Sequence, residues 1–477
     1  MSRYLNYGET AVRPGNYFNY DKKGNEPAAG ASDGITAVLF KSNWGPLNKA
    51  IVRTADEGYA GVFGTGGTTN VVALTYEGGT REAILVRIGT GGTAATVTLK
   101  NTDETPADAV TFTAKYVGSR AFTISIRDSI SDDALRECII YDSTTEFEKV
   151  EFAKSDTDEV TPLVAAFADS ENFAVAKASA SVSGKLATIT QTAFTAGTDP
   201  TASTTEYSAG FSVLDQNEQN CVIVDTSDYA VIALMNAYVQ RMFNAGKNVI
   251  GVGGENKTVA LATRMQLAAA CNANNMVYVL NGNIDHAVYG TIDGHQTAAK
   301  IAGMISGTSC KFSLTHTVLS SITALNELLT EGEIKNGELS GCLVLTLNAT
   351  RQVWIDSAIT TLVTLAANQD SGWKKIRRTK TRFELLTRAN NTVDEMIGKV
   401  DNDPAGRIAI MDAIRTVGVA MIGEGKIQYI QVTEDAAHPA EGDSCWFIID
   451  VIDKDSAEHI YLRYLFRYST QVLEETA

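Results

Sequence analysis

The sequence predicts a multi-domain protein of the α/β plus β class. Its 477 residues are too many for one ordinary core, and about three domains are expected at this length. Residues 220–280 alternate short apolar runs with helix-like segments, which predicts a mostly parallel sheet covered by helices. Residues 92–199 instead carry short alternating segments rich in Thr, Ala, Ser and Asp, which predicts a β-sandwich.

Composition and charge restrict the classes of partner. The formal net charge of −16 leaves no surplus of Lys and Arg, so we expect no binding to nucleic acid or to anionic membrane surfaces. The six cysteines are scattered without a C-x-x-C pair, so we expect reduced, buried thiols. The first residues lack the apolar segment of a signal peptide, and no apolar run approaches the roughly 20 residues that span a bilayer. We therefore expect a protein that folds in a cytoplasm and does not insert into membranes.

The N-terminal residues 1–33 are polar, dotted with aromatic side chains and rich in turn formers. Such a segment has little with which to build its own core, so it is either a disordered tail or an arm that becomes ordered on a partner. Residues 12–20 within it are compatible with a short extended piece after a Pro-Gly turn. The apolar run 34–40 then predicts a buried strand, which is followed by the turn Asn43-Trp44-Gly45-Pro46.

The predicted β-sandwich at 92–199 reads as an insertion into a host domain. Gly91-Gly92 precedes it and Gly197-Thr198-Asp199-Pro200 ends it, and we interpret these stretches as hinges. Surface loops tolerate such insertions well. The host α/β domain is predicted to comprise residues 34–91 and 200–350. Its later strands are expected at 220–225, 247–252 and 276–280, and its helices at 229–244 and 259–272.

Three short motifs of the host domain resemble chemical sites without matching them fully. Residues 251–258 resemble a phosphate-binding loop, but G-x-x-x-x-G-K-[ST] requires glycine where Asn256 stands. Asp225, His295 and Ser309 follow the chain order of a subtilisin-like triad, although neither Asp225 nor His295 has a recognisable local signature. The pairs Asp285-His286 and Asp293-His295 contain metal-ligand types, but such loop residues are usually solvated. We therefore expect no catalytic residue, cofactor or metal.

Residues 351–456 are predicted to form an α+β C-terminal domain. An intensely basic run opens it, within an otherwise acidic chain, at Lys374, Lys375, Arg377, Arg378, Lys380 and Arg382. Such a run is either a solvated face or a surface that pairs with an acidic partner. A helix is expected at 381–399. A second helix is expected to begin with Asp403 as its N-cap and Pro404 at its first position.

Three strands are expected after these helices, at 426–433, 445–452 and 460–468. In the last strand, alternation places one set of apolar side chains on a single face, namely Ile460, Leu462, Tyr464 and Phe466. This strand either completes the domain's own sheet or reaches a neighbouring chain, because the preceding residues 453–458 are polar and compatible with a linker. Strand addition would use the unpaired backbone groups of an exposed sheet edge.

Four motifs, taken in chain order, resemble those of the contractile-tail sheath proteins of bacteriophages and related contractile bacteriocins. They are Arg13-Pro14-Gly15, Asn43-Trp44-Gly45-Pro46, residues 298–307 with Ser313-Leu314-Thr315-His316, and residues 398–402 with Gly406. The chain has Met396-Ile397 where the family commonly has Tyr-Ile, a departure that affects packing. The resemblance spans nearly the whole chain except the predicted insertion.

The resemblance implies a subtilisin-like topology without protease function for the host domain, and an insertion that faces outward. It also implies that N- and C-terminal arms complete the C-terminal sheets of adjacent subunits. Carried over to this chain, the arms are residues 1–33 and 457–477. Their contacts would be Val12, Arg13, Tyr17, Phe18, Ile460, Leu462, Tyr464 and Phe466. Because the family's C-terminal domain lines the lumen around the tail tube, the basic run is a candidate tube-facing or subunit-facing contact.

The resemblance therefore predicts a structural subunit, and no enzyme, that polymerises helically around a tail tube and contracts to drive the tube through a bacterial envelope. Its expected partners are further copies of itself, the tube protein, and baseplate and tail terminator proteins. The expected location is a virion tail or contractile bacteriocin particle assembled in the host cytoplasm. Two alternatives stay open: a subtilisin-like serine hydrolase that uses Ser309, and a monomeric adhesive or carbohydrate-binding protein built on the insertion.

Overall fold

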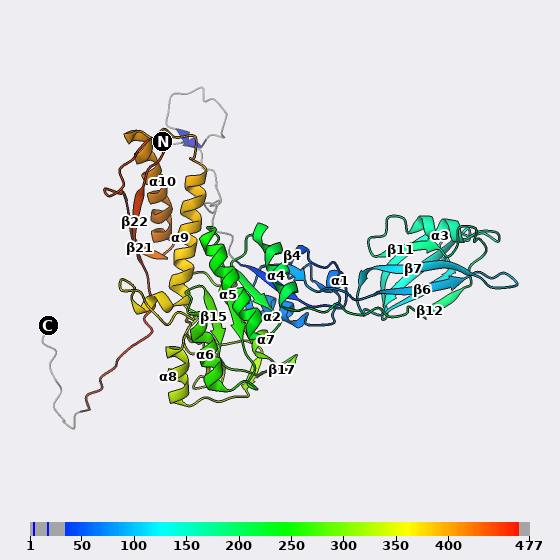
Figure 1. Cartoon of the computed structure of the whole chain (residues 1–477), viewed down its shortest axis with the longest axis horizontal. Coiled ribbons are helices and arrows are strands. Elements are labelled where there is room, and N and C mark those ends of the chain that lie inside the picture. The colour runs from blue at the N-terminus through cyan, green and yellow to red at the C-terminus, as the bar shows by residue number, and fades with distance from the viewer. Residues whose placement is uncertain (1–2, 5–16, 19–33, 467–477) are drawn as a thin grey trace.

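The computed structural model describes residues 3–4, 17–18 and 34–466. Figure 1 shows a central α/β domain, a β module that projects from it, and a C-terminal region of two long helices and a hairpin. The predicted mixed architecture of helices and several sheets is confirmed. Within the described ranges, no helix combines the length and the apolar character needed to cross a bilayer.

The central domain is built on a six-stranded sheet. Five neighbouring strands run parallel, and the edge strand is antiparallel to its neighbour. In spatial order the strands are β15 (Met276–Val279), β14 (Ile250–Gly254), β13 (Cys221–Val224), β3 (Ile35–Phe40), β5 (Glu82–Arg87) and β4 (Ala50–Thr54). The apolar runs of the sequence predicted four of these strands correctly, because strands covered on both faces carry continuous apolar residues.

Helices cover both faces of this sheet. Along β3, Val38 and Phe40 face one core, whereas Ala37 and Leu39 face the other. The first core lies under α2 (Asn70–Gly78) and α7 (Gly294–Gly307). The second core lies under α4 (Thr204–Val213), α5 (Tyr229–Asn244) and α6 (Leu261–Cys271). The helices expected at 229–244 and 259–272 are thus confirmed.

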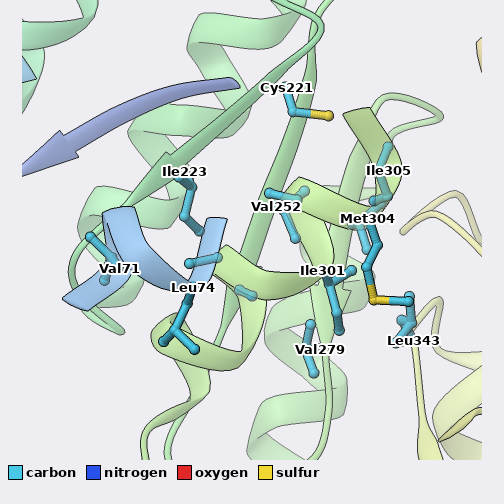
Figure 2. Packing of buried hydrophobic residues seen from close by; sticks show 14 of the residues in the cluster. Val71, Leu74, Cys221, Ile223, Val252, Val279, Ile301, Met304, Ile305 and Leu343 are labelled. Atoms are coloured by element: carbon cyan, nitrogen blue, oxygen red, sulfur yellow. The ribbon is translucent and has the colours of Figure 1, made fainter. Parts of the chain in front are cut away.

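Small residues bring α7 close to its neighbours. Figure 2 shows Ile301 and Ile305 of α7 among the buried side chains of the sheet strands, with Leu74 of α2 close by. A Cβ added at Gly303 would lie 2.1 Å from the carbonyl oxygen of Thr75 in α2. At Gly303 the close approach is therefore between two helices.

Residues 94–193 form a β module of two antiparallel sheets. One sheet contains β11 (Phe173–Lys177), β7 (Asp108–Val117) and β6 (Ala94–Lys100). The other contains β10 (Thr145–Ala153), β9 (Leu135–Asp142), β8 (Phe122–Asp128) and β12 (Ile189–Ala193). Apolar side chains of both sheets and of the short helix α3 (Val160–Ala166) share one core.

Trp44 joins this module to the central domain. It belongs to the turn after β3, yet its indole lies in the core of the module, in ring contact with Phe122 and Tyr116. The buried Arg87, at the end of β5, donates to the carbonyl oxygens of Gly45 (2.6 Å) and Val117 (2.9 Å). The turn that the sequence analysis singled out is therefore the structural link between the two bodies.

The C-terminal region packs two helices on a hairpin. Helix α9 (Ile376–Asp394) and helix α10 (Pro404–Gly423) lie beside the antiparallel pair β21 (Ile427–Glu434) and β22 (Phe447–Asp453). The Asp403 carboxylate accepts from the amide of Gly406 (2.6 Å), so the predicted N-cap is confirmed. Helix α9 begins five residues before the expected position, because the basic run is itself helical.

Shorter elements complete the described chain. They are β1 (Arg3–Tyr4), β2 (Tyr17–Phe18), α1 (Ala60–Phe63), η1 (Leu214–Gln216), β16 (Ile284–His286), β17 (Gly290–Ile292), β18 (Ile322–Leu325), α8 (Glu331–Leu339), β19 (Leu345–Leu347), β20 (Val353–Ile355) and η2 (Ser371–Lys374). Strands β1 and β2 pair in parallel.

Candidate assembly site

The β21–β22 hairpin is a two-stranded sheet that is covered on one face only. On its inner face, Ile430 and Val432 are buried against α10. A Cβ added at Gly418 of α10 would lie 2.3 Å from Ile430, so helix and sheet are in close contact. Neither outer edge of the hairpin pairs with another strand of the described chain. Such edges present free backbone N–H and C=O groups to a further strand.

The outer face of the same hairpin carries exposed apolar side chains beside the polar Gln431, Thr433 and Asp450. Tyr429 pairs with Ile452, and Ile448, four residues before Ile452 in β22, lies on the same face. All three side chains are exposed, and Trp446, just before β22, is 43% exposed. Clustered exposed apolar groups are typical of surfaces that another molecule covers.

The chain that follows β22 is held at its base by the basic start of α9. The Lys375 amine pairs with Asp455 (2.8 Å) and Glu458 (3.0 Å). Arg378 Nε pairs with Asp453 (2.7 Å). Burial alone lowers the pKa of Lys375, but its bonds to Asp455 and Glu458 outweigh burial and raise it. We call residues 453–458 the arm base.

Beyond the arm base, the chain leaves the body. Figure 1 shows the segment after β22 running away from the C-terminal helices. Residues 460–466 form no strand with the described chain, and their apolar side chains are exposed, from 65% at Leu465 to 96% at Phe466. Of the two arrangements that the sequence left open, the strand within the domain's own sheet is not the one found. The predicted contact residues Ile460, Leu462, Tyr464 and Phe466 are all in this segment.

The six residues of the basic run do not form one open cationic face. None of their side chains is fully exposed. Arg377 donates to Ser456 (2.7 Å), and Lys380 donates to the carbonyl oxygens of Ile305 and Thr308. Arg382 lies over the ring of Trp373, 4.0 Å from its centroid. Several of these cations thus contact groups of their own chain. A contact with a tube or subunit stays a prediction.

The predicted N-terminal contacts are only partly described. Val12 and Arg13 lie outside the described residues, as does most of the segment 1–33. Tyr17 and Phe18 form β2, whose backbone pairs with Arg3 and Tyr4 of β1.

The carboxyl end of the central sheet, where open α/β sheets bind their ligands, is filled by the chain itself. Lys41 follows β3 and Asp225 follows β13, at the point where the strand order reverses. The buried Asp225 carboxylate pairs with the Lys41 amine (2.9 Å) and accepts from the hydroxyls of Thr68 and Tyr207. Burial raises the pKa of Tyr207, so this hydroxyl stays protonated and donates.

The triad hypothesis is wrong. His295 lies in the first turn of α7, whereas Ser309 follows the last residue of the same helix. Because this helix is 14 residues long, the two side chains are separated by about 20 Å. His295 Nδ1 instead lies 3.2 Å from Ser227 Oγ. Burial lowers the pKa of His295, which favours the neutral imidazole.

The other two chemical motifs also have structural partners. Gly251, Gly253 and Gly254 lie within β14, and a Cβ at Gly254 would lie 2.5 Å from the Gly294 carbonyl oxygen. These glycines allow close packing within the sheet and against α7. The buried His286 faces Glu77 at 2.8 Å, and its other nitrogen accepts from the amides of Val288 and Tyr289. Asp285 accepts from Thr291 (2.8 Å) and Asn326 (2.7 Å).

Two features of this site were missed from sequence. Trp373 directly precedes the basic run in the sequence, yet its ring lies under the Arg382 guanidinium. The acids of residues 453–458 read as a polar linker, yet three of them pair with α9. Their opposite charge to the basic run was the available signal. The pairing could not be predicted because the acids lie about 75 to 80 residues after the basic run in the sequence.

Comparisons with known proteins agree with this architecture. A sheath tail protein from Desulfitobacterium hafniense superposes with a TM-score of 0.69 at 17% identity, covering 92% of this chain and 100% of that one. A sheath tail protein from Listeria innocua gives a TM-score of 0.66 at 16% identity, covering 88% and 95% of the two chains.

This chain has the fold of a tail sheath protein. The helical sheath of the anti-feeding prophage, in its contracted state, is a more distant match with a TM-score of 0.53 at 10% identity, covering 96% of this chain and 99% of that one. No family model and no curated protein matches the sequence. The resemblance that was drawn from four short motifs is thus confirmed at the level of the fold.

Proposed function

We propose that this chain is the structural subunit of a contractile tail sheath. The observation that carries the proposal is the pairing of a sheath fold with an incomplete C-terminal region. The hairpin has open edges and an exposed apolar face, and the arm after residue 458 holds its apolar side chains in solvent. A neighbouring copy would supply the missing strand, since an exposed sheet edge accepts an extended segment.

In this proposal each arm adds to the hairpin of an adjacent subunit, and head-to-tail contacts that do not close generate a helix. Contraction would be a rigid-body rearrangement of subunits, with the exchanged strands holding the lattice together. The tube protein, baseplate and tail terminator proteins are the further partners, and the particle is a virion tail or a contractile bacteriocin assembled in the host cytoplasm. The central domain would be subtilisin-like in topology, with residues 92–199 as an outward-facing sandwich insertion.

Catalysis has no place in this proposal. The ion pair of Lys41 and Asp225 fills the position of an α/β ligand site, and Ser309 lies at the opposite end of α7 from His295. A monomeric adhesive protein built on the β module would leave the exposed arm and the open hairpin without a role. The sheath subunit accounts for both.

The test is electron microscopy of the purified full-length chain beside two variants. One variant lacks residues 457–477, and the other keeps the length but replaces Ile460, Leu462, Tyr464 and Phe466 by serine. We expect hollow tubes or stacked rings from the full chain and their loss in both variants. Uniform monomers from the full chain at high concentration, with and without tube protein, would contradict the proposal.

A further inference from the structure

A groove of about 550 Å³ separates α9 from the hairpin. Trp373, Arg378 and Arg382 line it on the helix side. Ile449, Asp450, Val451 and Asp453 of β22 line it on the other. The groove thus places apolar side chains and a strand next to a cation, which suits an extended segment that carries both apolar and acidic residues.

Arg382 is the unsatisfied group in this groove. Its guanidinium lies over Trp373, and its Nη2 donates to Thr379 Oγ1 (2.9 Å). Its Nη1 is buried and has no hydrogen-bond partner in the described part of the chain. Burial lowers the pKa of Arg382 to about 10, an effect that the charge of Asp453 opposes only in part. A buried guanidinium with a free donor is stabilised by a carboxylate.

The two carboxylates whose charges act on Arg382 are already engaged. Asp453 and Asp370 both pair with Arg378, at 2.7 and 2.8 Å. Lys375, one turn earlier, has Asp455 and Glu458. Arg382 therefore differs from Lys375 and Arg378, because Asp370, Asp453, Asp455 and Glu458 form no ion pair with it.

We propose that this groove receives the acidic end of the arm of a second copy, with Glu474 or Glu475 paired to Arg382. The proposal rests on the sheath function proposed above and deepens it, because it names the groups that set the register of strand exchange. The sequence Val472-Leu473-Glu474-Glu475 provides apolar residues next to two acids. Its charge is complementary to Arg382, and its apolar pair suits Ile449 and Val451.

The arm has the reach for this contact. Extended chain rises about 3.3 Å per residue, so the stretch from Glu458 to Glu474 spans up to about 50 Å. In Figure 1 residues 459–466 lead away from the C-terminal helices of their own chain. A second copy is therefore the natural donor. The N-terminal segment also contains acids, but they are single and interspersed with Arg13, Lys22 and Lys23.

The experiment measures the concentration at which the full-length protein assembles, by sedimentation and electron microscopy. We expect R382Q and the double variant E474Q/E475Q each to raise this concentration at least tenfold, because partly buried charge pairs across interfaces contribute that much. The combined variant R382Q/E474Q/E475Q should assemble at about the same concentration as either R382Q or E474Q/E475Q, because all three lose the same pair. Charge exchange, with R382E combined with E474K/E475K, should restore assembly that R382E alone abolishes. K399E, an exposed cation just after α9, is the matched control and should assemble normally.

Normal assembly of E474Q/E475Q would overturn this proposal while leaving the sheath function intact. Restoration of R382E by reversing Glu9 or Asp21, instead of Glu474 and Glu475, would assign the groove to the N-terminal segment and would also overturn it. If the unaltered chain fails to assemble under every condition, the sheath function falls, and this proposal falls with it. Thermal unfolding of each variant separates loss of assembly from loss of folding.

Discussion

The β module and the β21–β22 hairpin are both antiparallel, and a tryptophan lies against each, yet one is covered on both inner faces and the other is not. Trp44 is 1% exposed in the core between the two sheets of the module, whereas Trp446 is 43% exposed beside the hairpin. In the module, the two sheets pack together and bury their inner faces in one core. A hairpin with helices on one side leaves its outer face and edges to another molecule. This difference supports the proposed assembly through the C-terminal region and not through the projecting module.

The largest expected loss of stability is in the β module. Trp44→Ala removes a fully buried ring that contacts Phe122 and Tyr116 and joins the module to the central domain. We expect it to lower the free energy of unfolding by about 3–5 kcal/mol. Thermal or urea unfolding measures this loss. A change below about 1 kcal/mol would show that the link between the two bodies does not depend on the indole.

The next effect tests close packing in the central domain. A Cβ at Gly303 would lie 2.1 Å from the Thr75 carbonyl oxygen, so Gly303→Ala must push α7 and α2 apart. We expect a loss of about 1–3 kcal/mol in the free energy of unfolding. The matched control is Gly332→Ala in α8, where a Cβ meets no atom within 4 Å. That change should be neutral or stabilise by up to about 1 kcal/mol.

A smaller effect concerns pH near the arm base. Burial, the neighbouring Asp356 and the charge of Glu458 raise the pKa of Glu338 to about 7. Because the folded chain holds this proton more tightly than the unfolded chain, stability should fall as pH rises from about 4.5 to about 7. We expect Glu338→Gln to flatten this decline by about 1 kcal/mol, after allowance for partial exposure. Unfolding curves at pH 5 and pH 8 compare the two proteins, and an unchanged slope would refute the assignment.

The smallest expected loss of stability is that of Trp446→Ala, which tests the contrast between the two tryptophans. Trp446→Ala removes an exposed ring, so we expect a change of no more than about 1 kcal/mol in the free energy of unfolding. Assembly of the same variant should need a higher protein concentration, because the outer face of the hairpin loses apolar area. A large loss of stability with normal assembly would reverse the roles given to the two tryptophans.

Elements set by local patterns could be predicted from the sequence. Continuous apolar runs identified β3 and β13, and the Asp403-Pro404 pair identified the start of α10. Long-range pairing could not be predicted in the same way. The sequence did not reveal the pairing of the basic run, because its acids lie at the end of β22 and just after it, about 75 to 80 residues later. Trp44 read as part of a turn, because nothing local shows that its ring enters another module.

The most direct test of the account is hydrogen exchange of backbone amides in the unassembled and assembled protein. We predict that amides of β22 and of residues 460–466 exchange at least a hundredfold more slowly after assembly, because they gain partners in an added strand. Amides of residues 94–193 should exchange at the same rate in both states. Assembled particles in which β22 and residues 460–466 remain unprotected, or in which protection appears in the β module instead, would contradict the account.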